Sequence, residues 1–185
     1  MEDPLFDTTK SFSDFDIAPQ ILDTLKSLNY KHPTRIQSES LPYTLKHRDI
    51  IALAETGSGK TLSFALPIIQ ALINNPRPYY ALVLAPTREL CLQIQEHFNA
   101  VGSIVGLRSV VIVGGLDLVS QSVALVNKKP HVIIASPGRI LHHLENTKGF
   151  SLSKLGCFVL DEADKLLSMN FEEALDKIIS LIPRE

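Results

Sequence analysis

The run AETGSGKT, residues 54–61, has the glycine spacing of a phosphate-binding turn. In such a turn, consecutive backbone N–H groups face phosphate oxygens, and the positive end of the following helix adds to the attraction. Lys60 would supply a mobile cation for the outer phosphates, and Thr61 a hydroxyl for Mg²⁺. The residues that we expect to hold the phosphates are Ala54, Glu55, Thr56, Gly57, Ser58, Gly59, Lys60 and Thr61.

Three carboxylates follow a later apolar run, in the sequence CFVLDEAD of residues 157–164. An aspartate at the end of a buried strand can hold Mg²⁺ directly or through water, and we assign that role to Asp161. Glu162, one residue on, points the other way and is placed to polarise an attacking water. The pattern predicts hydrolysis of a nucleoside triphosphate with Mg²⁺, with Lys60, Asp161 and Glu162 as the catalytic residues.

The elements that position these residues follow from five apolar runs that do not alternate with polar residues. Such runs are typical of strands buried on both faces, and helical patterns between them indicate a parallel sheet. The sequence therefore predicts an α/β fold, with a parallel sheet sandwiched by helices. The expected strands lie within residues 49–54, 79–86, 109–114, 131–137 and 157–163.

Parallel sheets bind ligands at the carboxyl ends of their strands. The phosphate loop, PTREL (86–90), the glycine pair at 114–115, SPGR (136–139) and DEAD (161–164) all follow expected strands. We therefore expect these five segments to lie on one rim and to form one composite site.

Composition narrows the class of protein. The formal net charge is −2, so the protein as a whole does not attract nucleic acid electrostatically. Any contact with nucleic acid must therefore use a local basic patch. Cys91 and Cys157 make no disulfide framework and lie in apolar stretches, where neither is a credible nucleophile. There is no run of about eighteen apolar residues, and the N-terminus is acidic and polar, so we expect a soluble intracellular protein without a membrane span.

Together with Phe12 and Gln37, these motifs occur in the order and spacing of one known family. The chain resembles, over essentially its whole length, the first RecA-like domain of the DEAD-box ATP-dependent RNA helicases. That resemblance implies a RecA-like P-loop NTPase domain that binds ATP and Mg²⁺. It also implies that Phe12 stacks on adenine and that Gln37 reads the adenine edge, for which an amide that donates and accepts is suited. Taken alone, Phe12 would be read as a core anchor and Gln37 as a helix-surface residue.

The resemblance also implies contact with the RNA sugar-phosphate backbone. Phosphate contacts fix register without reading sequence, and two arginines on two rim loops, beside glycines that allow close approach, fit that use. The predicted RNA residues are Pro86, Thr87, Arg88, Gly114, Gly115, Ser136, Pro137, Gly138 and Arg139. Ser136 replaces the family's usual threonine but keeps the hydroxyl, and Asn29 replaces a usual glycine that Asn can mimic at positive φ.

The resemblance sets expectations for the whole protein. Residues 1–28 would form an N-terminal arm and 29–185 the ATP-binding domain, while the Ser-Ala-Thr motif and the second RecA-like domain, with its arginine fingers, lie outside this sequence. We therefore expect the chain alone to bind ATP without turnover, as a monomer, and the full-length protein to unwind or remodel RNA. HLENTKGF (143–150) resembles the branch that processes ribosomal RNA, which suggests the nucleus or nucleolus.

Two alternatives stay open at this point. The chain could be a stand-alone nucleotide-binding switch or RNA-binding scaffold, although it lacks a guanine-reading NKxD segment and an LSGGQ-like signature. It could also belong to a DNA translocase of the same superfamily, which Gln37 and the literal DEAD sequence disfavour.

Overall fold

The computed structural model describes residues 5–183, and the chain divides into two compact units. The first unit runs to Asn75 and includes residues 100–106, while the second comprises 76–99 and the chain from Leu107 onward. The helix α4 (Arg88–Gly102) begins in the second unit, and its last residues belong to the first. The proposed division into an arm of residues 1–28 and a domain of 29–185 stays a prediction.

The first unit is helical. It contains the 3₁₀ turn η1 (Phe12–Asp14), α1 (Pro19–Ser27), α2 (Arg35–Thr44), α3 (Lys60–Asn74) and the 3₁₀ turn η2 (Ser103–Val105). α2 packs along α3, and the side chains of Leu41, Leu66 and Ile69 are fully buried. Asn29 has φ 62°, so asparagine does adopt the left-handed conformation expected at this position.

The second unit is built on a sheet of four parallel strands in the order β2-β3-β1-β4. The strands are β1 (Ala81–Leu84), β2 (Ser109–Ile112), β3 (Val132–Ala135) and β4 (Cys157–Leu160). Ala135 at the end of β3 pairs with both Leu84 and Ile112, and Leu84 also pairs with Leu160. All four carboxyl ends are therefore level, and the loops that follow them share one rim.

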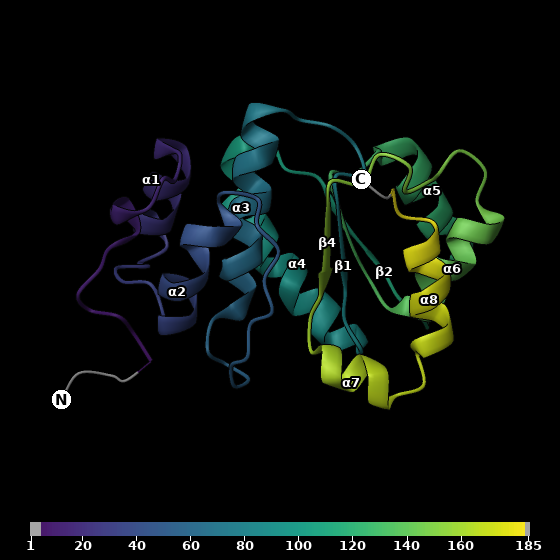
Figure 1. Cartoon of the computed structure of the whole chain (residues 1–185). Coiled ribbons are helices and arrows are strands. Elements are labelled where there is room, and N and C mark those ends of the chain that lie inside the picture. Colours follow the sequence, from purple (N-terminus) through teal and green to yellow (C-terminus); the bar gives the residue numbers. More distant parts are fainter. Residues whose placement is uncertain (1–4, 184–185) are drawn as a thin grey trace. The chain divides into compact units, whose positions relative to one another are not determined.

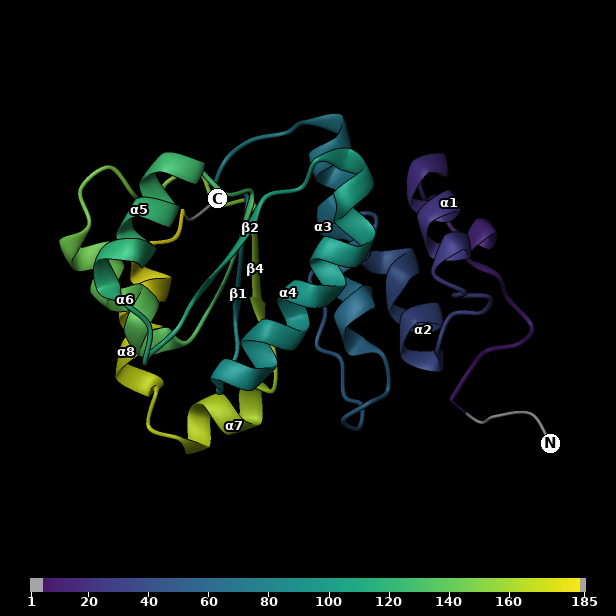
Figure 2. The same cartoon turned by 180° about the vertical axis from the view of Figure 1, so that it is seen from behind.

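Helices cover both faces of this sheet (Figure 1). One side carries α5 (Leu118–Lys128), α6 (Pro137–Asn146) and α8 (Glu172–Ser180), with the short α7 (Ala163–Ser168) following β4. Leu125, Ile140 and Ile178 from these helices share one buried cluster with alternate strand residues such as Leu84 and Ile133. The first part of α4 lies on the opposite side (Figure 2). The predicted α/β arrangement is confirmed.

One predicted strand is wrong. Residues 49–54 form no strand, and the side chains of Ile51 and Leu53 are 94% and 90% exposed. An apolar run shows that a segment can be a strand, but a parallel strand satisfies its backbone only through a neighbour in the sheet. Among the described residues this segment has no such neighbour.

The helices of the described chain are too short or too polar for a membrane span, so the structure offers no candidate for one.

Candidate functional site

The phosphate loop has the predicted local geometry. Gly57 and Gly59 have φ values of +85° and +87°, in the left-handed region that favours glycine, and the N–H of Ser58 donates to the Glu55 carbonyl oxygen at 3.2 Å. Helix α3 begins directly afterwards, at Lys60. The loop therefore leads into a helix N-terminus, as the sequence predicts for a phosphate-binding turn.

Two side chains of this loop indicate a site that is built for a ligand. The Lys60 ammonium donates to the carbonyl oxygens of Ala54 and Glu55, the latter at 2.8 Å, so the loop curls around the cation. The buried hydroxyl of Ser58 has no hydrogen-bond partner among the described residues. Buried polar atoms in native proteins nearly always have a partner, so this hydroxyl fits a loop whose partner is a bound molecule.

Gln37 connects α2 to the phosphate loop. Its side chain is 3% exposed; its Oε1 accepts from the Thr34 N–H at 2.9 Å, and its Nε2 donates to the Gly59 carbonyl oxygen at 2.9 Å. The first bond belongs to a capping box at the start of α2, in which Thr34 is the N-cap. One N–H and one lone pair of the amide remain after these two bonds. The residue predicted to read adenine therefore lies beside the loop predicted to hold phosphate.

This contact makes glycine essential at position 59. A Cβ there would come within 2.7 Å of the Gln37 Nε2 and 2.9 Å of the Thr34 Oγ1, whereas a Cβ at Gly57 would meet nothing within 4 Å. We expect both Gly→Ala variants to lose about 1–2 kcal/mol of folding free energy through left-handed strain. Gly59→Ala should lose about 1–3 kcal/mol more through the clash. Urea unfolding of the two variants measures the difference, and equal losses would contradict the contact.

Phe12, the residue predicted to stack on adenine, is 4% exposed and forms part of the buried interior of the first unit. Stacking by Phe12 stays a prediction, and its structural role as a core residue is what the structure shows.

The acidic motif lies in the second unit, at the end of β4. Asp161 is 8% exposed, its N–H donates to the Leu84 carbonyl oxygen at 2.9 Å, and its Oδ1 accepts from the Glu162 N–H at 3.0 Å. Glu162 has φ 50°, and its carboxylate pairs with the Lys165 ammonium at 2.9 Å. This bond is the main cause that raises the pKa of Lys165. The turn after β4 therefore holds the two carboxylates in different settings, one buried against the sheet and one beside a cation.

Cys91 lies in the same unit and is fully buried. Burial, followed by the charges of Asp161 and Glu89, raises the pKa of its thiol to about 12. A thiol held in this state forms no thiolate near neutral pH, in agreement with the expectation that Cys91 is not a nucleophile.

Three segments predicted to contact RNA meet on the rim of the second unit. Gly114, Ser136, Gly138 and Arg139 line one surface hollow together with Leu118, His142 and Phe171. Arg139 donates to the Leu116 carbonyl oxygen at 3.2 Å. Arg88 approaches from the third segment, since a Cβ at Gly115 would lie 3.5 Å from its Nη1. The rim thus gathers two arginines and three glycines around a concave surface.

The other predicted RNA residues take different positions. Thr87 is exposed, whereas Pro86 and Pro137 are buried, and contact of these three residues with RNA stays a prediction. Sequence reasoning missed Leu118, His142 and Phe171, because a lone apolar residue or histidine carries no spacing signal. Of the predicted Mg²⁺ ligands, Thr61 belongs to the first unit and Asp161 to the second.

Comparisons with known proteins agree with these motifs. The pattern of the family described as DEAD/DEAH box helicase matches residues 34–185. The chain is 57% identical over 178 residues to a protein of Coccidioides immitis named ATP-dependent rRNA helicase RRP3, covering 96% of this chain and 37% of that protein. It is 54% identical over 176 residues to the rrp3 protein of Schizosaccharomyces pombe, covering 95% of this chain and 38% of that protein. The chain thus spans little more than a third of these relatives' length.

Proposed function

Since the chain belongs to the DEAD/DEAH box helicase family, we propose that it is the ATP-binding, RNA-contacting part of an ATP-dependent RNA helicase. The observation that carries this proposal is the hydrogen bond from the Gln37 Nε2 to the Gly59 carbonyl oxygen. It joins an adenine-reading candidate to a phosphate loop within one compact unit, which a general phosphate-binding turn would not require.

In this proposal, the loop of residues 54–61 binds the ATP phosphates. The Lys60 ammonium exchanges its bonds to the Ala54 and Glu55 carbonyl oxygens for phosphate oxygens, which match its charge better. Thr61 of the first unit and Asp161 of the second unit are each a candidate ligand of Mg²⁺, which prefers oxygen ligands and usually takes only one or two carboxylates from the protein. Bound Mg²⁺ would neutralise charge on the phosphates, and Glu162 would accept a proton from the attacking water.

RNA would bind at the rim of the second unit. Arg88 and Arg139 supply positive charge beside the hollow that Gly114, Ser136 and Gly138 line, and glycines leave room for a phosphate to approach the backbone. Such contacts recognise the sugar-phosphate chain and not its sequence.

Ribosomal RNA processing is the finer proposal. The relatives above are named rRNA helicases, and the segment HLENTKGF at residues 143–150 resembles that branch. We place the full-length protein in the nucleus or nucleolus on these grounds, as a monomer whose second RecA-like domain completes the site. A stand-alone switch, an RNA-binding scaffold and a DNA translocase are not favoured by the family match.

Nucleotide choice tests the proposal on the chain itself. We expect the chain to bind ADP more tightly than GDP. In Gln37→Ala the two affinities should become similar, because the phosphate loop still binds the phosphates while no side-chain amide distinguishes adenine from guanine. Losing a hydrogen bond costs about 0.5–1.5 kcal/mol, so ADP affinity should fall by about two- to twelvefold. Isothermal titration calorimetry with both nucleotides measures this.

Thr34→Ala is the matched control. It disrupts the same capping box but keeps the Gln37 amide, so it should weaken ADP and GDP equally if it weakens either. Equal binding of ADP and GDP to the unaltered chain would defeat the adenine assignment.

A further inference from the structure

A chain of hydrogen bonds runs through the interior of the second unit and ends at the predicted RNA-binding glycines. The Gln121 Nε2 donates to the Val113 carbonyl oxygen at 2.9 Å, and the Gln121 Oε1 lies 3.3 Å from the His143 Nε2. The His143 Nδ1 lies 2.9 Å from the Thr147 Oγ1. Gln121 and His143 are 5% and 1% exposed, so these bonds are shielded from water.

The direction of each bond follows from the chemistry of the groups. Since the Gln121 Oε1 can only accept, the His143 Nε2 carries a proton and donates to it. Burial, followed by the charges of His142 and Arg139, lowers the pKa of His143, so the ring is neutral and its Nδ1 accepts. The Thr147 hydroxyl, at 2.9 Å, is the nearer donor to that nitrogen, and the Ser122 hydroxyl lies 3.4 Å from it.

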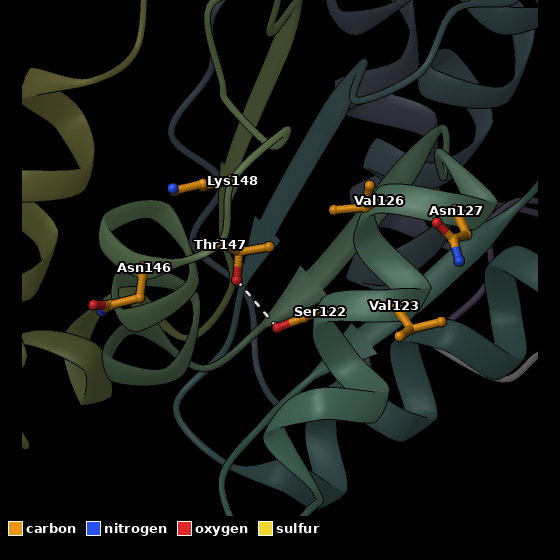
Figure 3. A pocket seen from close by; sticks show the side chains of 7 residues that line it. All are labelled: Ser122, Val123, Val126, Asn127, Asn146, Thr147 and Lys148. Carbon is orange, nitrogen blue, oxygen red and sulfur yellow. Dashed lines mark hydrogen bonds between the residues drawn. The ribbon is translucent and has the colours of Figure 1, made fainter.

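The outer end of this series of hydrogen bonds, at Thr147, reaches the surface. The hydroxyls of Ser122 and Thr147 lie 3.2 Å apart and point toward one another in a shallow pocket between α5 and the end of α6 (Figure 3). His143 and Thr147 both lie in HLENTKGF, the segment that the RNA-binding and ATP-binding motifs leave unexplained. Four residues apart at the end of α6, they are also joined through the backbone, since the Thr147 N–H donates to the His143 carbonyl oxygen at 2.9 Å.

The inner end fixes one peptide plane. The Val113 carbonyl and the Gly114 N–H belong to the same planar, trans peptide, in which the two groups point in opposite directions. Gln121 holds the carbonyl inward and thus directs the Gly114 N–H away from the interior. Glycine has no side chain and adopts many backbone conformations. The orientation of the 114–115 loop therefore has to be set by contacts from other residues.

We propose that Gln121 and His143 are positioning residues for RNA binding, which orient the Gly114–Gly115 loop so that its backbone can meet an RNA phosphate. The inference rests on the proposed RNA-binding role of this rim. It gives a structural role to the segment 143–150, which resembles the branch that processes ribosomal RNA: its His143 fixes the side-chain amide of Gln121.

The test uses the ¹⁵N-labelled chain, in which the backbone amide signals of Gly114 and Gly115 report the loop directly. In Gln121→Ala and His143→Phe, we expect these two signals to shift and their hydrogen exchange to speed up. Affinity for a short single-stranded oligouridylate should fall by about three- to tenfold. This is the effect expected from losing one hydrogen bond that holds the Gly114–Gly115 loop in place. His143→Gln keeps a donor toward Gln121 and should restore most of the affinity, whereas a purely structural role would not separate the two His143 variants.

Gln95→Ala is the matched control. The Gln95 Nε2 donates to the Ser109 carbonyl oxygen at 3.4 Å and to its hydroxyl at 3.2 Å, so it makes the same kind of bond at the amino end of β2, while Gln121 acts just beyond the carboxyl end. This variant should leave both glycine signals and the RNA affinity unchanged.

The outcomes separate this inference from the function on which it rests. If oligouridylate shifts no rim signal of the unaltered chain, the RNA site itself is overturned. If the unaltered chain and Gln121→Ala bind the RNA equally well, with the same glycine signals, only the positioning role is overturned.

Discussion

Replacing Glu162 by glutamine is expected to lower ATP hydrolysis by the proposed full-length helicase about a hundredfold or more, which is the usual contribution of a general base. An amide keeps the shape of the side chain but cannot accept a proton from water. ATP and RNA binding should persist, because neither depends on this charge. Steady-state hydrolysis with RNA present, set beside ATP and RNA affinities of the same variant, measures the effect.

The structure supplies a control for this variant. Glu162→Gln also removes the ion pair with Lys165, whose side chain is 54% exposed, and such surface pairs contribute at most about 1 kcal/mol. Lys165→Ala removes the same pair but keeps the carboxylate, so hydrolysis should stay within a few-fold of the unaltered protein. A full loss of hydrolysis in Lys165→Ala, or normal hydrolysis in Glu162→Gln, would contradict the assignment of Glu162 as the base.

Replacing Lys60 by alanine is expected to weaken ATP binding to the chain by about a hundredfold, beyond the range of calorimetry. Each hydrogen bond between charged groups is worth about 1.5–3 kcal/mol, and Lys60 would make such bonds to the outer phosphates. The fold should remain, because the hydrogen bonds that the structure gives the ammonium go to the loop carbonyl oxygens of Ala54 and Glu55 and not to the buried core. Calorimetric titration with ATP, with circular dichroism as the check on folding, measures this.

Lys26→Ala controls for the loss of one positive charge in the same unit. Lys26 lies on the exposed side of α1, and its replacement should leave ATP affinity unchanged. Unaltered ATP affinity in Lys60→Ala would mean that the loop is only a structural turn.

Local motifs were predictable because their geometry depends on neighbouring residues. The spacing of Gly57 and Gly59 predicted a phosphate-binding turn followed by a helix, and the structure has both glycines at positive φ and α3 beginning at Lys60. Four of the five apolar runs are strands, and because they are parallel their motifs do share one rim. The convergence of the glycine pair, SPGR and Arg88 on that rim follows from this topology.

Long-range partners were not predictable, since no short pattern encodes them. Residues 49–54 look like a strand, but only a neighbouring strand can make them one. The residue type alone suggested that Phe12 is a core anchor, whereas the family resemblance implied a stacking surface, and the structure places the residue in the core.

The sequence by itself determined which chemistry to expect of this protein: a phosphate-binding turn, a candidate magnesium-binding carboxylate, a candidate base and two arginines, each marked by residue type and spacing. Tertiary structure alone decided how these groups are held. Gln37 forms a hydrogen bond with Gly59, 22 residues further along the sequence. The series of hydrogen bonds from Thr147 through His143 and Gln121 to Val113 joins the end of α6 to the rim. Such bonds depend on which elements pack together, because a buried polar side chain must find its partner wherever the fold brings one.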